Sequence, residues 1–118
     1  MEGINLPMNE ARTERIKILK QYLEEDDNDH FSRYALALEV MESGGVNEAI
    51  QLLRKVLSQN ADFLAAYYQL GKACELGQAK EDAAEAYRQG LEVARRQKNA
   101  KTESELKAAL SSLLDDDE

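Results

Sequence analysis

The chain has 118 residues, 43% of them hydrophobic and 32% charged, which is the length and balance of one globular domain rather than two. Its formal net charge of -8 argues against nucleic-acid binding, because such binding depends on clustered Lys and Arg side chains. No run approaches the roughly 18 apolar residues of a membrane-spanning helix, so we expect one soluble domain over residues 1–118 and no membrane partner.

The first residues, MEGINLPMNEAR, have neither the basic opening nor the apolar stretch of a secretory signal, so we expect none. The single cysteine, Cys74, has no partner for a disulfide within the chain, which fits a reducing compartment and a cytoplasmic protein. After Pro7, the only proline, helix-forming residues dominate, and no stretch alternates apolar and polar residues as a strand does. The predicted fold class is all-α.

The first predicted helix covers 8–25 and places three apolar residues, Ile16, Leu19 and Leu23, on one face. It ends in the acidic run EEDDND at 24–29. A calcium loop would need a glycine at its turn and a glutamate at its twelfth position, and this run has neither. We therefore interpret it as a linker in which Asp29 caps the next helix.

Two helical pairs follow, over 30–63 and 64–97, and they repeat in a gapless register in which position 30 of the first unit corresponds to position 64 of the second. Equivalent residues of the two units are Leu36 and Leu70, Ala37 and Gly71, Ala49 and Ala83, Leu53 and Tyr87, and Leu57 and Leu91. Each pair of helices is broken by a short turn, at 43–45 in the first unit and at Gly77 and Gln78 in the second. Many helices end with a residue in the left-handed backbone conformation, which glycine adopts easily, so we expect Gly77 to adopt it.

A last predicted helix covers 100–114, with Leu106, Ala109, Leu110 and Leu113 on one face, and an acidic tail follows at 115–118. It fits the first helix of another unit only if about two residues are inserted after 97, and we interpret it as a cap on the apolar face of its neighbour. The helix over 8–25 likewise corresponds to the second helix of a preceding unit. The prediction is about six helices: half a unit, two units and a cap.

This pattern resembles the tetratricopeptide repeat, whose Trp-x-x-Leu-Gly-x-x-Tyr, Ala and Phe positions match Tyr67, Leu70, Gly71, Ala83 and Tyr87. Cys74 stands where the signature has its tyrosine, and Arg33 replaces the tryptophan in the first unit. The resemblance implies a short right-handed α-solenoid. It also implies a non-enzymatic protein-interaction module or scaffold that binds a peptide or helix of a partner protein in its concave groove.

Residues with catalytic chemistry are few. His30 follows Asp29 and is predicted to be an exposed residue at a helix end, while Cys74 shares a face with Leu70 and is predicted to fill the core. Only rapid labelling of native Cys74 would favour a small enzyme with a cysteine nucleophile. The sequence shows no zinc-ligand spacing and no glycine-rich phosphate loop, so we expect no metal, no cofactor and no enzyme activity.

The family groove is lined by the first helix of each unit. Carried over by register, its residues are Phe31, Tyr34, Leu38, Met41 and Glu42 in the first unit, and Ala65, Tyr68, Lys72 and Glu75 in the second. We expect the partner to contact Phe31, Tyr34, Leu38, Met41, Tyr68 and Lys72. The first four residues also have the spacing of a core stripe, so the sequence leaves open whether the flanking helices cover them.

Family members that bind chaperone tails hold a carboxylate with a lysine and two asparagines in this groove. Here the matching positions are Tyr34, Leu38 and Gln69, with only Lys72 basic nearby. This departure favours an apolar segment or an amphipathic helix as the partner. The alternative is a structural protein that forms homodimers through the same apolar surface, so the expected state is a monomer or a weak homodimer.

Overall fold

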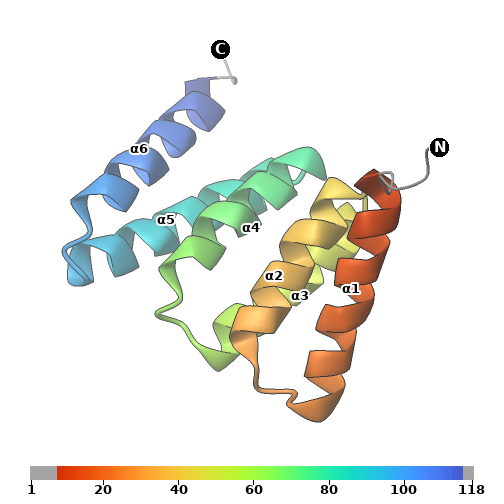
Figure 1. Cartoon of the computed structure of the whole chain (residues 1–118). Helices are drawn as coiled ribbons and strands as arrows, with labels where there is room; N and C mark the ends of the chain where they lie inside the picture. Colours follow the sequence, from red (N-terminus) through yellow and green to blue (C-terminus); the bar gives the residue numbers. More distant parts are fainter. Residues whose placement is uncertain (1–7, 116–118) are drawn as a thin grey trace.

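The computed structural model describes residues 8–115, which form six α-helices and no strand within that range. In chain order they are α1 (Met8–Glu25), α2 (His30–Glu42), α3 (Val46–Gln59), α4 (Leu64–Leu76), α5 (Lys80–Arg96) and α6 (Ala100–Asp115). Each helix packs against the next, so that the chain forms a short array of helical hairpins (Figure 1). The predicted all-α fold is confirmed. Residues 116–118 of the predicted acidic tail lie outside the described range.

The helix positions follow the repeat register. Helices α2 and α4 begin at 30 and 64, and α3 and α5 begin at 46 and 80, so both pairs of helices start at equivalent positions of the two units. Helix α6 begins at 100 rather than at 98, where an exact third unit would start, and this agrees with the predicted insertion. The extra length belongs to α5, which has 17 residues where α3 has 14.

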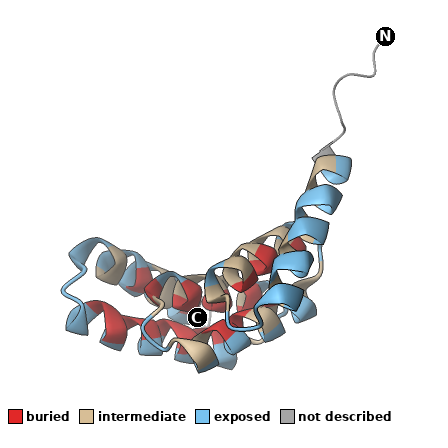
Figure 2. Cartoon of the chain, turned by 60° about the horizontal axis from the view of Figure 1, so that its bottom comes forward, coloured by how far each residue is buried: buried red, intermediate tan, exposed pale blue. Residues whose placement is uncertain are grey.

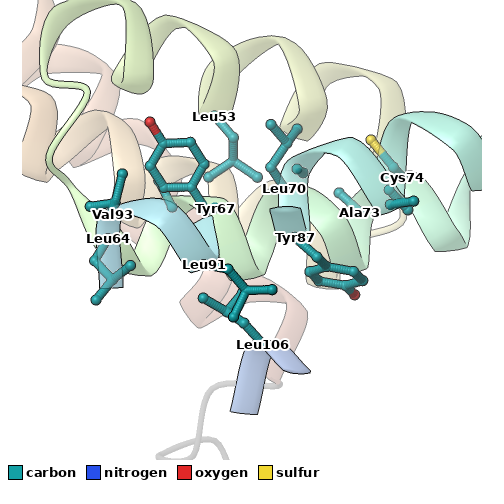
Figure 3. Close-up of a cluster of buried hydrophobic side chains, with 14 of the residues drawn as sticks. Leu53, Leu64, Tyr67, Leu70, Ala73, Cys74, Tyr87, Leu91, Val93 and Leu106 are labelled. Carbon is teal, nitrogen blue, oxygen red and sulfur yellow. The ribbon is translucent and has the colours of Figure 1, made fainter. Parts of the chain in front are cut away.

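The main core lies between the helices of the two units and α6. Its largest fully buried side chains are Tyr87, Leu53, Leu106, Val56 and Cys74. Figure 3 shows Leu53, Leu70, Tyr67 and Tyr87 among the side chains of this cluster. Leu106 of α6 has no exposed surface, so the last helix covers part of the apolar side of α5.

Glycines in two helices permit close helix contacts. A Cβ added at Gly71 of α4 would lie 2.1 Å from Cε1 of Tyr87 on α5. A Cβ added at Gly90 of α5 would lie 2.7 Å from Cβ of Tyr67 and 3.1 Å from Cδ1 of Leu106. The absence of a side chain at Gly71 is therefore what lets the Tyr87 ring pack against the backbone of α4.

A long polar side chain ties each unit to the linker that precedes it. Arg33, which is 5% exposed, donates from Nη1 to the carbonyl of Asp27 at 2.7 Å. Tyr67 is its equivalent in the second unit, and its hydroxyl donates to the carbonyl of Ala61, the equivalent of Asp27, at 2.8 Å. Arg33 also donates to the side chains of Gln59 at 2.6 Å and Asp27 at 2.8 Å. Two chemically different side chains thus make the same linker contact.

Three helices end with a residue in the left-handed region: α2 at Gly44 (φ 93°), α4 at Gln78 (φ 61°) and α5 at Lys98 (φ 59°). At each end the next amide donates back to a helix carbonyl, from Gly45 to Val40, from Ala79 to Cys74 and from Asn99 to Ala94, at 2.8–2.9 Å. The expectation that Gly77 supplies the left-handed residue is wrong, because its φ is -85°. Gln78 takes this conformation, at the position of the second unit that is equivalent to Gly44.

Helix α1 is held at the edge of the array. From residue 9 onward it contributes no buried residue, and only Ile16, Leu19 and Leu23 pack against the small cluster of Leu36, Val40 and Ala49. Polar contacts supplement this packing, because Arg12 and Arg15 bind the carboxylate of Glu39 on α2 at 2.8–3.1 Å. Figure 2 shows the long exposed surface of α1 against the buried centre of the array.

Candidate functional site

The six predicted groove residues all keep accessible surface. Phe31 is 69% exposed, and the other five, Tyr34, Leu38, Met41, Tyr68 and Lys72, are partly buried. Tyr34, Met41 and Tyr68 also pack against the main core with part of their surface. The sequence leaves open whether other helices cover the apolar stripe on α2. In the structure Phe31 stays exposed, whereas Tyr34, Leu38 and Met41 are partly buried.

Four aromatic side chains meet where α2 begins and where the loop between α3 and α4 ends. We call His30, Phe31, Tyr34 and Phe63 the aromatic corner. The Phe63 ring lies 4.9 Å from Tyr34, 5.4 Å from Phe31 and 5.6 Å from His30, measured between ring centroids. His30 and Phe31 are 4.8 Å apart. These distances are typical of favourable aromatic contacts, so the corner is a preformed apolar surface.

The aromatic corner includes two residues that the sequence analysis did not assign to the site. His30 is the first residue of α2, as predicted, but the expectation that it is exposed is wrong, because its ring is partly buried against Phe31 and Phe63. Phe63 stands at the N-cap of α4, in the position equivalent to Asp29, whose side chain accepts from the amide of Ser32 at 3.0 Å. A phenylalanine cannot accept such a hydrogen bond. Its presence at a helix N-cap is the sequence feature that could have indicated a role for Phe63 other than capping.

A second group of side chains lies on α4 and α5. The ammonium of Lys72 lies 5.4 Å from the centre of the Tyr68 ring, and that ring lies 6.2 Å from the Tyr87 ring. The Tyr87 hydroxyl donates to a carboxylate oxygen of Glu75. Burial, reinforced by that carboxylate, raises the pKa of Tyr87, so the hydroxyl remains a neutral donor at physiological pH. The predicted groove positions are thus mainly aromatic and apolar on α2 and mixed with polar groups on α4.

Helix α6 has small and polar residues at the positions that correspond to the predicted groove residues of α4. When the starts of α4 and α6 are aligned, Ala65, Tyr68, Lys72 and Glu75 correspond to Lys101, Ser104, Ala108 and Ser111, and all four residues on α6 are exposed. None of them is aromatic or a large apolar residue. Among the compared positions, the aromatic and large apolar side chains are therefore concentrated on α2.

Cys74 is fully buried in the core, as predicted. Burial raises the pKa of its thiol above the usual value, which the nearby Arg54 only partly opposes. Within residues 8–115 no group of three or more His, Cys, Asp or Glu side chains is placed to hold a metal ion. In the same range no helix has the length and hydropathy needed to cross a membrane.

The sequence profile of one family, described as tetratricopeptide repeat, matches residues 9–93. The chain belongs to the tetratricopeptide repeat family. No curated protein matches this chain. A tetratricopeptide repeat domain protein from Salinibacter ruber, solved by NMR, is 36% identical, with 75% of this chain and 89% of that chain covered and a TM-score of 0.70.

Two more distant structures share the fold of this tetratricopeptide repeat chain. The type III secretion chaperone SycD of Yersinia enterocolitica, solved in complex with a peptide of the translocator YopD, is 11% identical; 93% of this chain and 85% of that chain are covered, with a TM-score of 0.83. PcrH, solved in complex with the chaperone binding region of PopD, is 12% identical; 93% of this chain and 84% of that chain are covered, with a TM-score of 0.86.

Proposed function

We propose that this tetratricopeptide repeat chain is a non-enzymatic interaction module that binds a peptide or helix of a partner protein along α2 and α4. The observation that carries the proposal is the accessible aromatic surface on neighbouring first helices, made of exposed Phe31 and the partly buried Tyr34 and Tyr68. Large aromatic side chains are frequent energetic anchors of interfaces, and they lose little conformational entropy on binding. SycD and PcrH support the proposal, because each was solved with a segment of another protein.

The chemistry of this surface favours an apolar or amphipathic segment over a free carboxylate. Among the six groove residues only Lys72 is basic, and its ammonium already lies near the Tyr68 ring. A partner helix that places apolar residues at i, i+3 and i+4 would contact Tyr34 and Tyr68 on its buried side. The burial of Cys74 gives no support to a catalytic role.

The test is affinity capture followed by mass spectrometry with matched tyrosine variants. Tyr34→Ala combined with Tyr68→Ala should reduce capture of specific partners at least about tenfold, which is the loss expected of interface anchors. Tyr22→Ala is the control, because Tyr22 is 49% exposed on α1 outside the groove. Since Tyr34 and Tyr68 are half-buried, circular dichroism must show that the double variant is folded, and Lys72→Glu gives a second, milder variant.

Equal capture by the wild-type chain and both groove variants would refute the proposal. Light scattering at several concentrations checks the alternative of self-association through the same surface. A concentration-dependent dimer that Tyr34→Ala and Tyr68→Ala dissociate would favour that alternative. A monomer at all concentrations would exclude it.

A further inference from the structure

The aromatic corner leaves one residue unusually open. Phe31 is 69% exposed, the highest value among the large hydrophobic residues of the described chain, ahead of Leu76 at 63% and Tyr22 at 49%. His30 and Phe63 nevertheless contact its ring, at centroid distances of 4.8 Å and 5.4 Å. The ring thus contacts two aromatic neighbours while much of its surface faces solvent.

Two acidic loops border this corner at the same edge of the array. Two contacts join the loop before α2 and the start of α2 to the end of α3 and the loop that follows it: Gln59, the last residue of α3, donates to the carbonyl of Asp27 at 3.0 Å, and Asn60 lies 3.4 Å from His30. We call the carboxylates of these loops and of the end of α1 the acidic rim. Its members are Glu24, Glu25, Asp26, Asp27, Asp29 and Asp62.

Most of the acidic rim has no paired cation. Arg33 pairs with Asp27 at 2.8 Å and Arg96 pairs with Asp62 at 2.7 Å. The carboxylates of the other four rim residues form no ion pair within residues 8–115. The six rim carboxylates carry more negative charge than Arg33 and Arg96 neutralise, and none of the four residues of the aromatic corner is a lysine or arginine, so we expect a net negative potential beside the corner.

We propose that the aromatic corner binds an arginine or lysine side chain of the partner segment, with the cation against the open face of Phe31 and the acidic rim around it. This proposal rests on the proposed function and specifies what the partner brings to one end of the groove. Aromatic faces attract cations through their quadrupole, and nearby carboxylates add a longer-range attraction. An acidic segment would be repelled, and a purely apolar anchor would gain nothing from the rim.

A random library of twelve-residue peptides displayed on phage tests the proposal without a known partner. Peptides selected on the folded wild-type chain are resynthesised, and their affinities are measured by fluorescence anisotropy. We expect the selected peptides to share an Arg or Lys whose replacement by Ala weakens binding about tenfold. That loss should shrink to less than about twofold on the Phe31→Ala chain, because the two changes remove the same contact.

Two further variants separate a cation contact from simple apolar burial. Phe31→Leu keeps an apolar side chain without a ring and should bind about as weakly as Phe31→Ala, whereas Phe31→Tyr should bind like the wild type. Leu76→Ala is the matched control, because Leu76 is 63% exposed at the end of α4 and outside the aromatic corner. It should leave peptide affinity unchanged.

The contribution of the acidic rim is tested by neutralising Asp26 and Asp62 to Asn. The amide oxygen can still accept the bond that Asp26 receives from the amide of Asn28 at 2.9 Å, and the pair between Asp62 and Arg96 is more than half exposed. Stability should therefore change little. Affinity should fall about threefold at low salt, and the difference from the wild type should narrow above about 0.5 M salt as the charges are screened.

The outcomes distinguish this inference from the proposed function. Selected peptides that lack a basic residue, or that bind the Phe31→Leu chain as tightly as the wild type, overturn the inference. Peptides that lose affinity with Tyr68→Ala but not with Phe31→Ala also overturn it, while the groove proposal stands. A library that yields no specific peptide counts against both.

Discussion

The contact between Gly71 and Tyr87 gives the sharpest prediction for stability. In Gly71→Ala the new methyl group would lie 2.1 Å from a ring carbon of Tyr87, which is fully buried and bound to Glu75. Forcing extra volume into a packed core costs about 1–3 kcal/mol, and such a short contact places this case near the upper end. Alanine regains about 1 kcal/mol of helix propensity over glycine. The net loss should be about 2 kcal/mol.

The first unit supplies the compensating change. At the corresponding positions it has Ala37 and Leu53, and both are fully buried. A leucine therefore tolerates the alanine methyl group that a tyrosine ring excludes. In a Tyr87→Leu background we expect Gly71→Ala to be neutral or to stabilise by up to about 1 kcal/mol, because only the helix-propensity term remains. The double-mutant cycle should give a coupling energy of about 2–3 kcal/mol.

Urea unfolding followed by far-ultraviolet circular dichroism measures the four free energies of the cycle. The single variant Gly71→Ala should also melt about 8 °C below the wild type, at roughly 4 °C per kcal/mol for a domain of this size. Tyr87→Leu alone loses the hydrogen bond to Glu75 and serves as the reference for the second half of the cycle. Equal costs of Gly71→Ala in the two backgrounds would refute the steric argument.

Three further changes test contacts of the fold. Arg33→Met removes the hydrogen bonds to the linker and should lower the free energy of unfolding by about 2 kcal/mol; an unchanged urea midpoint would contradict this role. Gln78→Gly should stabilise by about 0.5–1 kcal/mol, because Gln78 holds a left-handed backbone that glycine adopts freely; a lower melting temperature would contradict that reasoning. Glu39→Gln should cost under about 1 kcal/mol at pH 7, since its partners are partly exposed. Hydrogen bonding to Arg15 lowers the pKa of Glu39, so this stabilisation is present above the usual glutamate value of about 4.3 and is lost as pH falls through the lowered pKa; a wild-type advantage that persists at pH 2 would be inconsistent with it.

The repeat register predicted most of the fold because helix contacts recur at fixed spacing. The positions of Gly71, Ala83 and Tyr87 defined the second unit, and the same spacing applied upstream and downstream located α1 and α6. At the helix ends the register holds, but the position of the glycine does not. Gly44 is in the left-handed region, and its equivalent in the second unit is Gln78 rather than the neighbouring Gly77.

The remaining features depend on contacts that no local pattern encodes. The sequence shows Arg33 only as a departure from tryptophan, because its acceptors on Asp27 and Gln59 become neighbours only when the linker folds over the end of α3. For the same reason, the sequence predicts only part of the aromatic corner. Phe31 and Tyr34 follow from the spacing along α2, whereas Phe63 joins them from another loop.

The shallow attachment of α1 has a consequence for how the chain opens. Because this helix buries so little, the free energy of its detachment is well below that of global unfolding, and its amides should exchange with solvent through a local opening. The amides of α4 and α5, which surround the main core, should exchange only when the whole domain unfolds. An opening of α1 would uncover Leu36 and Val40, so the N-terminal end of the array is the one from which proteolysis and aggregation would start.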